Sequence, residues 1–204
     1  MSLDFIFSIL ILIFSIVIHE VSHGYVAYLQ GDNTARFQGR LTLNPMKHLE
    51  WFGSFLLPVM SYMFGGFIIG WAKPVPFNPY NLRNQRWGEA MVALAGPASN
   101  ICVALFFGLL IRFGITSQFG QAFTYISSTI VFINLILATF NLIPIPPLDG
   151  SKILFSILPY SMQGVRDFLE RNGLFVLIFF IFFLWKFVLP LVVFEFSLIT
   201  GLIP

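Results

Sequence analysis

The chain is short of charge. Only 10% of its 204 residues are Asp, Glu, Lys or Arg, whereas 57% are hydrophobic. A soluble domain carries about 25% charged residues, and the mean hydropathy here is +0.86. The composition therefore excludes an ordinary soluble domain and indicates an integral membrane protein that crosses the bilayer several times. The formal net charge of +2 is too small to indicate nucleic-acid binding.

Cysteine and internal repeats are also scarce. The single cysteine, Cys102, excludes internal disulfides and leaves no cysteine cluster for a metal site. Without repeats, we expect residues 1–204 to form one membrane domain, with a core of about residues 1–158 and a C-terminal span of about residues 173–196. The first apolar run lacks a basic start and a small-residue cleavage site, so we expect it to be retained rather than cleaved as a signal peptide.

The most informative stretch is His19-Glu20-Val21-Ser22-His23, at the end of the apolar run 3–18. Histidines four residues apart share one helix face, so two imidazoles can hold one ion. Glu20 is then placed to take a proton from a zinc-bound water. This is the His-Glu-x-x-His signature of zinc metalloproteases. The alternative is two interfacial histidines at a helix end. It does not explain Glu20, because an acid at the end of a membrane helix is energetically costly.

A second motif spans residues 141–150, Asn-Leu-Ile-Pro-Ile-Pro-Pro-Leu-Asp-Gly. Its three prolines predict a broken membrane helix, which is tolerated only where it is buried in protein or lines a wet cavity. The carboxylate of Asp149 is a good third zinc ligand, and Gly150 lets the backbone turn close to the metal. Alternatively, Asp149 caps a helix that begins at Ser151. Two histidines and one aspartate leave a position for water, as in catalytic zinc sites.

The remaining pattern predicts an all-α fold of about four to six membrane segments. Residues 3–29, 89–112 and 121–141 are long enough to span a bilayer. Residues 51–70 either span or re-enter. Six of the eleven Lys and Arg residues lie between Gln30 and Glu89, and positive loops favour the cytoplasm. We therefore expect residues 51–70 to re-enter, the N-terminus to lie outside, and the zinc site to lie nearer the cytoplasmic face.

Two further stretches are candidates for substrate contact. Between Gly39 and Pro45, polar and apolar residues alternate, and this pattern predicts a short strand or hairpin after the first helix. Its edge would pair with an extended peptide through Leu41, Thr42, Leu43 and Asn44; the alternative is an interfacial loop, with the nearby His48 as an interfacial residue.

In the stretch Gly96-Pro97-Ala98-Ser99-Asn100, small residues allow close helix contact. Pro97 bends the helix or frees a backbone group there. Asn100 requires a polar partner inside the membrane. It either bridges helices or holds a substrate or an oxyanion.

Three motifs occur in the order of a known family: His19-Glu20-x-x-His23, Gly96-Pro97-x-x-Asn100 and Asn141-x-x-Pro144-x-x-Pro147-Leu148-Asp149-Gly150. Over about residues 1–158 the chain resembles the site-2 protease family of intramembrane zinc metalloproteases, peptidase family M50. The resemblance implies one Zn²⁺ per chain, held by His19, His23 and Asp149, with Glu20 as the catalytic base. It also implies that Gly96, Pro97, Asn100 and Asn141 line the active site.

The resemblance further implies a function and partners. Family members hydrolyse peptide bonds in or near transmembrane segments of other membrane proteins. The expected partners are therefore a transmembrane protein substrate and the lipid bilayer, and a homo-oligomer stays open. The chain is similar to small prokaryotic members, without a PDZ or CBS domain, which places it in a prokaryotic cell membrane.

Two other functions compete with this interpretation. A membrane metal transporter predicts internal repeats and acids in several spans, and the sequence has neither. A membrane-embedded zinc protease that trims soluble or lipidated tails typically takes its third ligand from a Glu on a later helix. Glu170 and Glu195 are the later candidates, and neither lies in a convincing motif.

Overall fold

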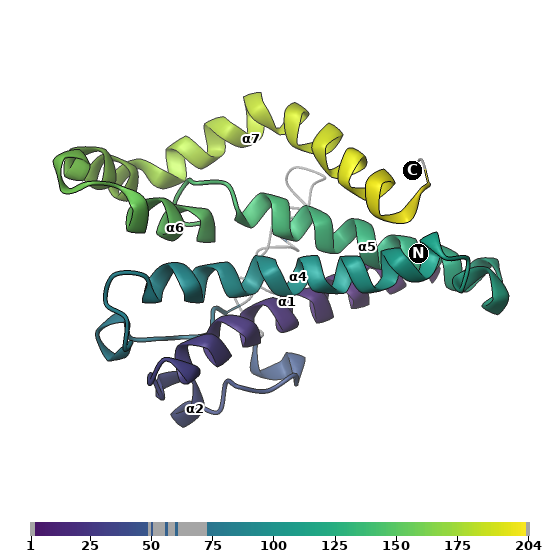
Figure 1. Cartoon of the computed structure of the whole chain (residues 1–204), viewed down its shortest axis with the longest axis horizontal. Helices are drawn as coiled ribbons and strands as arrows, with labels where there is room; N and C mark the ends of the chain where they lie inside the picture. Colours follow the sequence, from purple (N-terminus) through teal and green to yellow (C-terminus); the bar gives the residue numbers. More distant parts are fainter. Residues whose placement is uncertain (1–2, 49, 51–55, 57–59, 61–72, 203–204) are drawn as a thin grey trace.

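The computed structural model describes residues 3–48 and 73–202 and the single positions 50, 56 and 60. Within these residues the chain is helical and has no strand (Figure 1). The longer helices are α1 (Leu3–Leu29), α4 (Gly88–Arg112), α5 (Gln121–Asn141), α6 (Asp149–Ile157) and α7 (Gln163–Thr200). The short ones are α2 (Thr34–Phe37), η1 (Pro45–Lys47), η3 (Pro79–Asn81), η4 (Thr116–Phe119) and η5 (Tyr160–Met162).

Helices α1, α4 and α5 form the centre of the molecule. Each is long and apolar enough to cross a membrane, over Ile6–Leu29, Gly88–Arg112 and Gln121–Asn141. Contacts between them fix their directions. His23 meets Val92 while Ser15 meets Asn100, so α4 runs opposite to α1. Helix α5 runs the same way as α1 (Figure 1).

The core lies between α4, α5 and α7. It is built from small and branched side chains and one aromatic ring: Ala104, Ile111, Val131, Leu135, Val188, Val192 and Phe196. Elsewhere large apolar residues such as Phe14, Phe106 and Phe182 are exposed. Since lipid tails are as apolar as these side chains, association rests on close packing rather than on burial from water. The described part therefore has the surface of an integral membrane protein.

Helix α7 is bent. The stretch Tyr160–Phe183, which includes η5, and the stretch Lys186–Thr200 are inclined by 71° to each other. Together they are long and apolar enough to form one further span, broken at the bend, or a re-entrant loop. The described residues thus hold three candidate spans, or four with α7, against the four to six expected. The predicted re-entrant segment 51–70 lies almost entirely outside the described residues.

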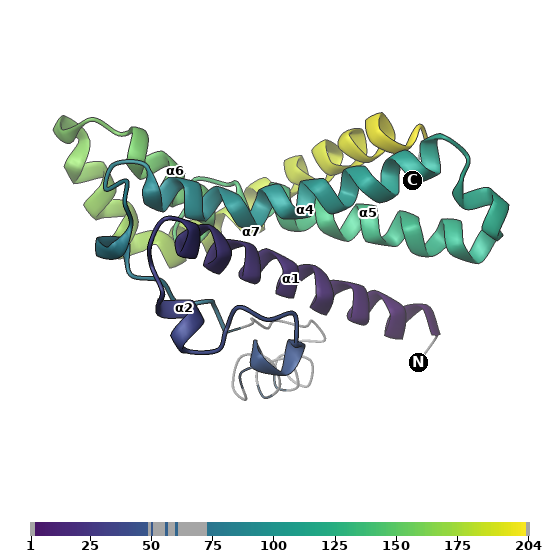
Figure 2. The ribbon, with the colours of Figure 1, turned by 60° about the horizontal axis from the view of Figure 1, so that its bottom comes forward.

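The strand or hairpin predicted between Gly39 and Pro45 is wrong. Residues 40–44 are bends and irregular backbone, although the polar–apolar alternation is present. The chain here is shaped by local bonds rather than by a neighbouring strand. The backbone N–H of Arg40 donates to the Ala35 carbonyl (2.9 Å), and the His48 ring bonds the Thr42 carbonyl (2.8 Å). Figure 2 shows α2 and the chain that follows it on the side of α1 away from α4 and α5.

Candidate metal centre

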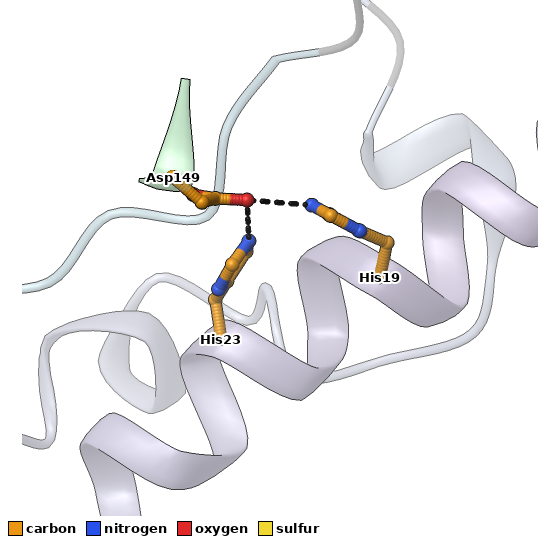
Figure 3. Close-up of side chains that lie close together, drawn as sticks. All are labelled: His19, His23 and Asp149. Carbon is orange, nitrogen blue, oxygen red and sulfur yellow. Dashed lines mark hydrogen bonds and ion pairs between the residues drawn. The ribbon is translucent and has the colours of Figure 1, made fainter. Parts of the chain in front are cut away.

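Three side chains from two distant motifs meet at one point. His19 and His23 project from one face of α1, and Asp149 projects from the first residue of α6 (Figure 3). Asp149 Oδ2 lies 3.1 Å from His19 Nε2 and 3.3 Å from His23 Nε2. Both histidines are buried, and the three ligand atoms lie within 4.8 Å of one another.

Each histidine is oriented by a bond from its other ring nitrogen. His19 Nδ1 lies 2.6 Å from Asn100 Oδ1, and His23 Nδ1 lies 2.7 Å from the Val92 carbonyl. A carbonyl oxygen can only accept, so both Nδ1 atoms carry the proton. Each Nε2 therefore presents a lone pair towards Asp149. Such outer bonds fix the tautomer of metal-ligating histidines.

This arrangement fits a zinc ion. Two imidazole lone pairs and a carboxylate oxygen repel one another at contact distance unless a cation lies among them. Zn–N and Zn–O distances of about 2.0–2.2 Å in a tetrahedral site place neighbouring ligand atoms about 3.3 Å apart. The separations of 3.1 and 3.3 Å between Asp149 Oδ2 and the two Nε2 atoms are close to that spacing. The donor set of two nitrogens and one oxygen is also one that zinc prefers.

Asn100 belongs to a buried polar chain that crosses the bundle. Its side-chain N–H donates to Asn134 Oδ1 (2.8 Å) and to the Ser15 carbonyl (3.3 Å). Asn134 in turn donates to Ser15 Oγ (2.9 Å). Both asparagines are fully buried. These bonds fix the direction of the Asn100 amide, so its oxygen is the atom that faces His19.

Two glycines allow the elements to approach the centre. A Cβ on Gly96 would lie 2.5 Å from the rings of His19 and His23, so only glycine lets α4 pass behind them. A Cβ on Gly150 would lie within 2.5 Å of the Ile143 carbonyl. The first turn of α6 therefore packs directly on the loop before it, and this contact brings Asp149 to α1.

A cavity of about 200 Å³ opens beside the three ligands. Glu20 lines it from α1, and Oε2 of Glu20 accepts a hydrogen bond from the backbone N–H of Val75 (2.8 Å). Lys152 and Asn141 also line the cavity. The Lys152 ammonium lies 4.6 Å from the centre of the Phe77 ring. The cavity thus brings a carboxylate beside the candidate metal-binding cluster, an arrangement that is compatible with activation of a water.

The other predicted residues are distributed around the site. Pro97 is buried within α4. The side chain of Asn141 is turned back to the Leu137 carbonyl (2.9 Å). Residues 41–44 do not line the cavity, although the side chain of Leu41 lies against Gly24, next to His23. Their contact with substrate stays a prediction.

The residues named in the alternative interpretations have other contacts. Asp149 makes no capping bond at the start of α6. Glu170 pairs with Arg166, and Glu195 accepts from Thr139. His48 is buried against Thr42.

Sequence reasoning missed Asn134, Ser15 and Val75. A signal existed for Asn134, because it is an amide inside a predicted span and requires a partner as Asn100 does. Nothing local marks Val75, since its contribution is a backbone N–H.

Comparisons with known proteins agree with one another. The family described as "Peptidase family M50" matches the chain over residues 7–131 and 118–184. "Putative zinc metalloprotease YwhC" of Bacillus subtilis is 39% identical over 189 residues, which cover 90% of this chain and 80% of that protein. "Putative zinc metalloprotease Rip2" of Mycolicibacterium smegmatis is 34% identical over 67% of this chain and 51% of that protein. "Zinc metalloprotease MJ0392" of Methanocaldococcus jannaschii is 27% identical over 73% of this chain and 33% of that protein. No solved structure gives a significant match.

Proposed function

Because the chain belongs to peptidase family M50 and is a zinc metalloprotease, we propose that it hydrolyses peptide bonds in or near transmembrane segments of other membrane proteins. It holds one Zn²⁺ per chain through His19, His23 and Asp149. Glu20 is the general base. The enzyme is an integral protein of a prokaryotic cell membrane, and its substrates reach it within the bilayer.

The observation that carries this proposal is the depth of the ligand cluster. Both histidines lie inside the candidate span Ile6–Leu29, and their partners Val92 and Asn100 lie inside the candidate span Gly88–Arg112. A site enclosed by spans is reached most directly by a substrate that is itself in the membrane.

Each residue has a defined task in the reaction. Zinc bound by the cluster would acidify a water and polarise the scissile carbonyl. Glu20 accepts the proton of the attacking water and then delivers it to the leaving nitrogen of the peptide bond. Asn100 and Val92 keep the imidazoles turned towards the metal while charge develops. The cavity walls limit access of bulk water to the reacting atoms.

The test pairs two variants in detergent-purified protein. We expect Glu20→Gln to retain about one zinc per chain and to cleave no member of a panel of tagged single-span membrane proteins that the wild type cleaves. Asp149→Ala should lose most of its zinc, because two imidazoles alone bind it weakly. Cleavage by Glu20→Gln would refute the base assignment. Full zinc content in Asp149→Ala would refute the ligand assignment.

The proposed topology places the N-terminus outside and the zinc site nearer the cytoplasmic face. It rests on the six basic residues between Gln30 and Glu89 and on the common direction of α1 and α5. We expect a cysteine introduced at Arg83, in a Cys102→Ser background, to be labelled by an impermeant thiol reagent only after the cells are opened. Labelling of intact cells would overturn this orientation.

A further inference from the structure

The segment Lys73–Phe77, here called the strap, crosses the face of α1 that carries the catalytic motif. It is irregular backbone with prolines at 74 and 76. Val75 is its buried residue, 5% exposed, and packs on Gly24, where a Cβ would come 2.6 Å from Val75 Cγ1. The strap therefore sits directly on the helix that carries Glu20.

One bond ties the strap to the base. The backbone N–H of Val75 donates to Glu20 Oε2 at 2.8 Å, the one hydrogen bond described for this carboxylate. A glutamate side chain has three rotatable bonds, and without a partner its carboxylate samples several positions. With Oε2 held, the carboxylate samples fewer positions, and Oε1 remains to accept a proton.

Three sets of hydrogen bonds hold the strap and the residue just after it in place. The guanidinium of Arg40, a residue only 7% exposed, donates to the carbonyls of Lys73 and Pro74 at 3.3 Å. The backbone N–H of Lys73 donates to the His48 carbonyl (2.8 Å). Just beyond the strap, the backbone N–H of Asn78 donates to Asp32 Oδ2 (2.9 Å). Arg40 belongs to the segment predicted as a substrate strand and His48 lies just after it, so this part of the chain supports the strap.

We propose that Val75, through its backbone N–H, is a positioning residue for Glu20, and that Arg40 maintains this contact by fixing the strap. The inference rests on the proposed role of Glu20 as the base. Strand pairing with a substrate is a poor alternative role for the strap. Pro74 and Pro76 have no N–H, and the N–H of Val75 is already committed to Glu20. A peptide alongside would find acceptors but no donor among these three residues.

The first experiment compares Val75→Pro with Val75→Ala. Alanine shortens the side chain and keeps the N–H, whereas proline keeps three side-chain carbons, as valine has, and removes the N–H. Because Val75 precedes Pro76, extended or polyproline II backbone is favoured at position 75, and the polyproline II range includes the φ angle that proline requires. With a single-span model protein that the wild type cleaves, we expect kcat of Val75→Pro to fall about 10- to 100-fold below that of Val75→Ala. KM and zinc per chain should match between the two.

The second experiment acts on the anchor. Arg40→Met should lower kcat in the same direction without loss of zinc, and Arg40→Lys should restore part of it. Arg36→Met is the matched control, since Arg36 is exposed and bonds Tyr28 rather than the strap. It should cleave as the wild type does.

The outcomes separate the two proposals. Equal kcat in Val75→Pro and Val75→Ala would overturn the positioning role, and so would a higher kcat in Val75→Pro, which would make the strap an inhibitory contact. Loss of zinc in Val75→Pro alone would show that the strap supports the metal site rather than the base. If Glu20→Gln cleaves normally, the proposed function fails first, whatever the Val75 variants do.

Discussion

The bond between Asn100 and His19 makes a quantitative prediction. Replacing Asn100 by Leu keeps a side chain of similar shape but leaves His19 Nδ1–H without its acceptor at 2.6 Å. Outer-shell changes of this kind cost about 10- to 100-fold in metal affinity. That factor corresponds to about 1.4–2.8 kcal/mol. The same substitution also leaves Asn134 Oδ1 without its donor, so both the metal site and the fold should weaken.

The assay is competition for zinc between the detergent-purified protein and a chelating dye. The loss of zinc affinity should be larger in Asn100→Leu than in Asn134→Leu. Asn134→Leu leaves the Asn100 amide its bond to the Ser15 carbonyl, and should cost only a few-fold. Asn172→Leu is the control, because Asn172 is only half-buried and its described side-chain bond, to the Phe168 carbonyl, stays within α7. Thermal unfolding of the zinc-free proteins measures the structural part separately.

Two results would refute the reasoning. One is a zinc affinity of Asn100→Leu within twofold of the wild type. The other is an effect of Asn134→Leu that equals or exceeds that of Asn100→Leu. Either would mean that His19 does not depend on the amide for its orientation.

Two further predictions use the same protein. Gly96→Ala should lower zinc content and cleavage, because its Cβ would lie 2.5 Å from the histidine rings, whereas Gly164→Ala, with no atom within 4 Å, should behave as the wild type. Asp32 should make the strap's support acid-sensitive: burial alone would raise its pKa, but hydrogen bonds from Thr34, Asn81 and the backbone of Asn78 lower the pKa overall. Its stabilisation is then complete above its ordinary pKa of about 3.9 and is lost as the pH falls below that through the lowered value. Limited proteolysis at pH values from about 7 to about 3 should show this loss of stability as faster cleavage near the strap at low pH. Asp32→Asn should flatten the pH dependence.

Much of the helical framework could be predicted from the sequence. Apolar runs of bilayer length set α1, α4 and α5 within one or two residues, because an apolar stretch in lipid must satisfy its backbone within a helix. The same reasoning failed between Gly39 and Pro45. An alternating pattern favours a strand only where a neighbouring strand can pair with its backbone. The described residues around positions 39–45 instead bond this backbone through side chains and turns.

By itself, the sequence determined the candidate residues for the chemistry: two histidines at helical spacing, a glutamate between them, and a later aspartate after a run of prolines. These follow from spacing along one helix and from the ligand preferences of zinc, which are local properties. The tertiary structure decided what no local pattern contains. It places Asp149 next to the histidines and places Asn100 and the Val92 carbonyl where they orient the imidazoles. It also brings the backbone N–H of Val75 into contact with Glu20. Those contacts join residues between 55 and 130 positions apart, and they depend on how the helices pack against one another rather than on any spacing within the chain.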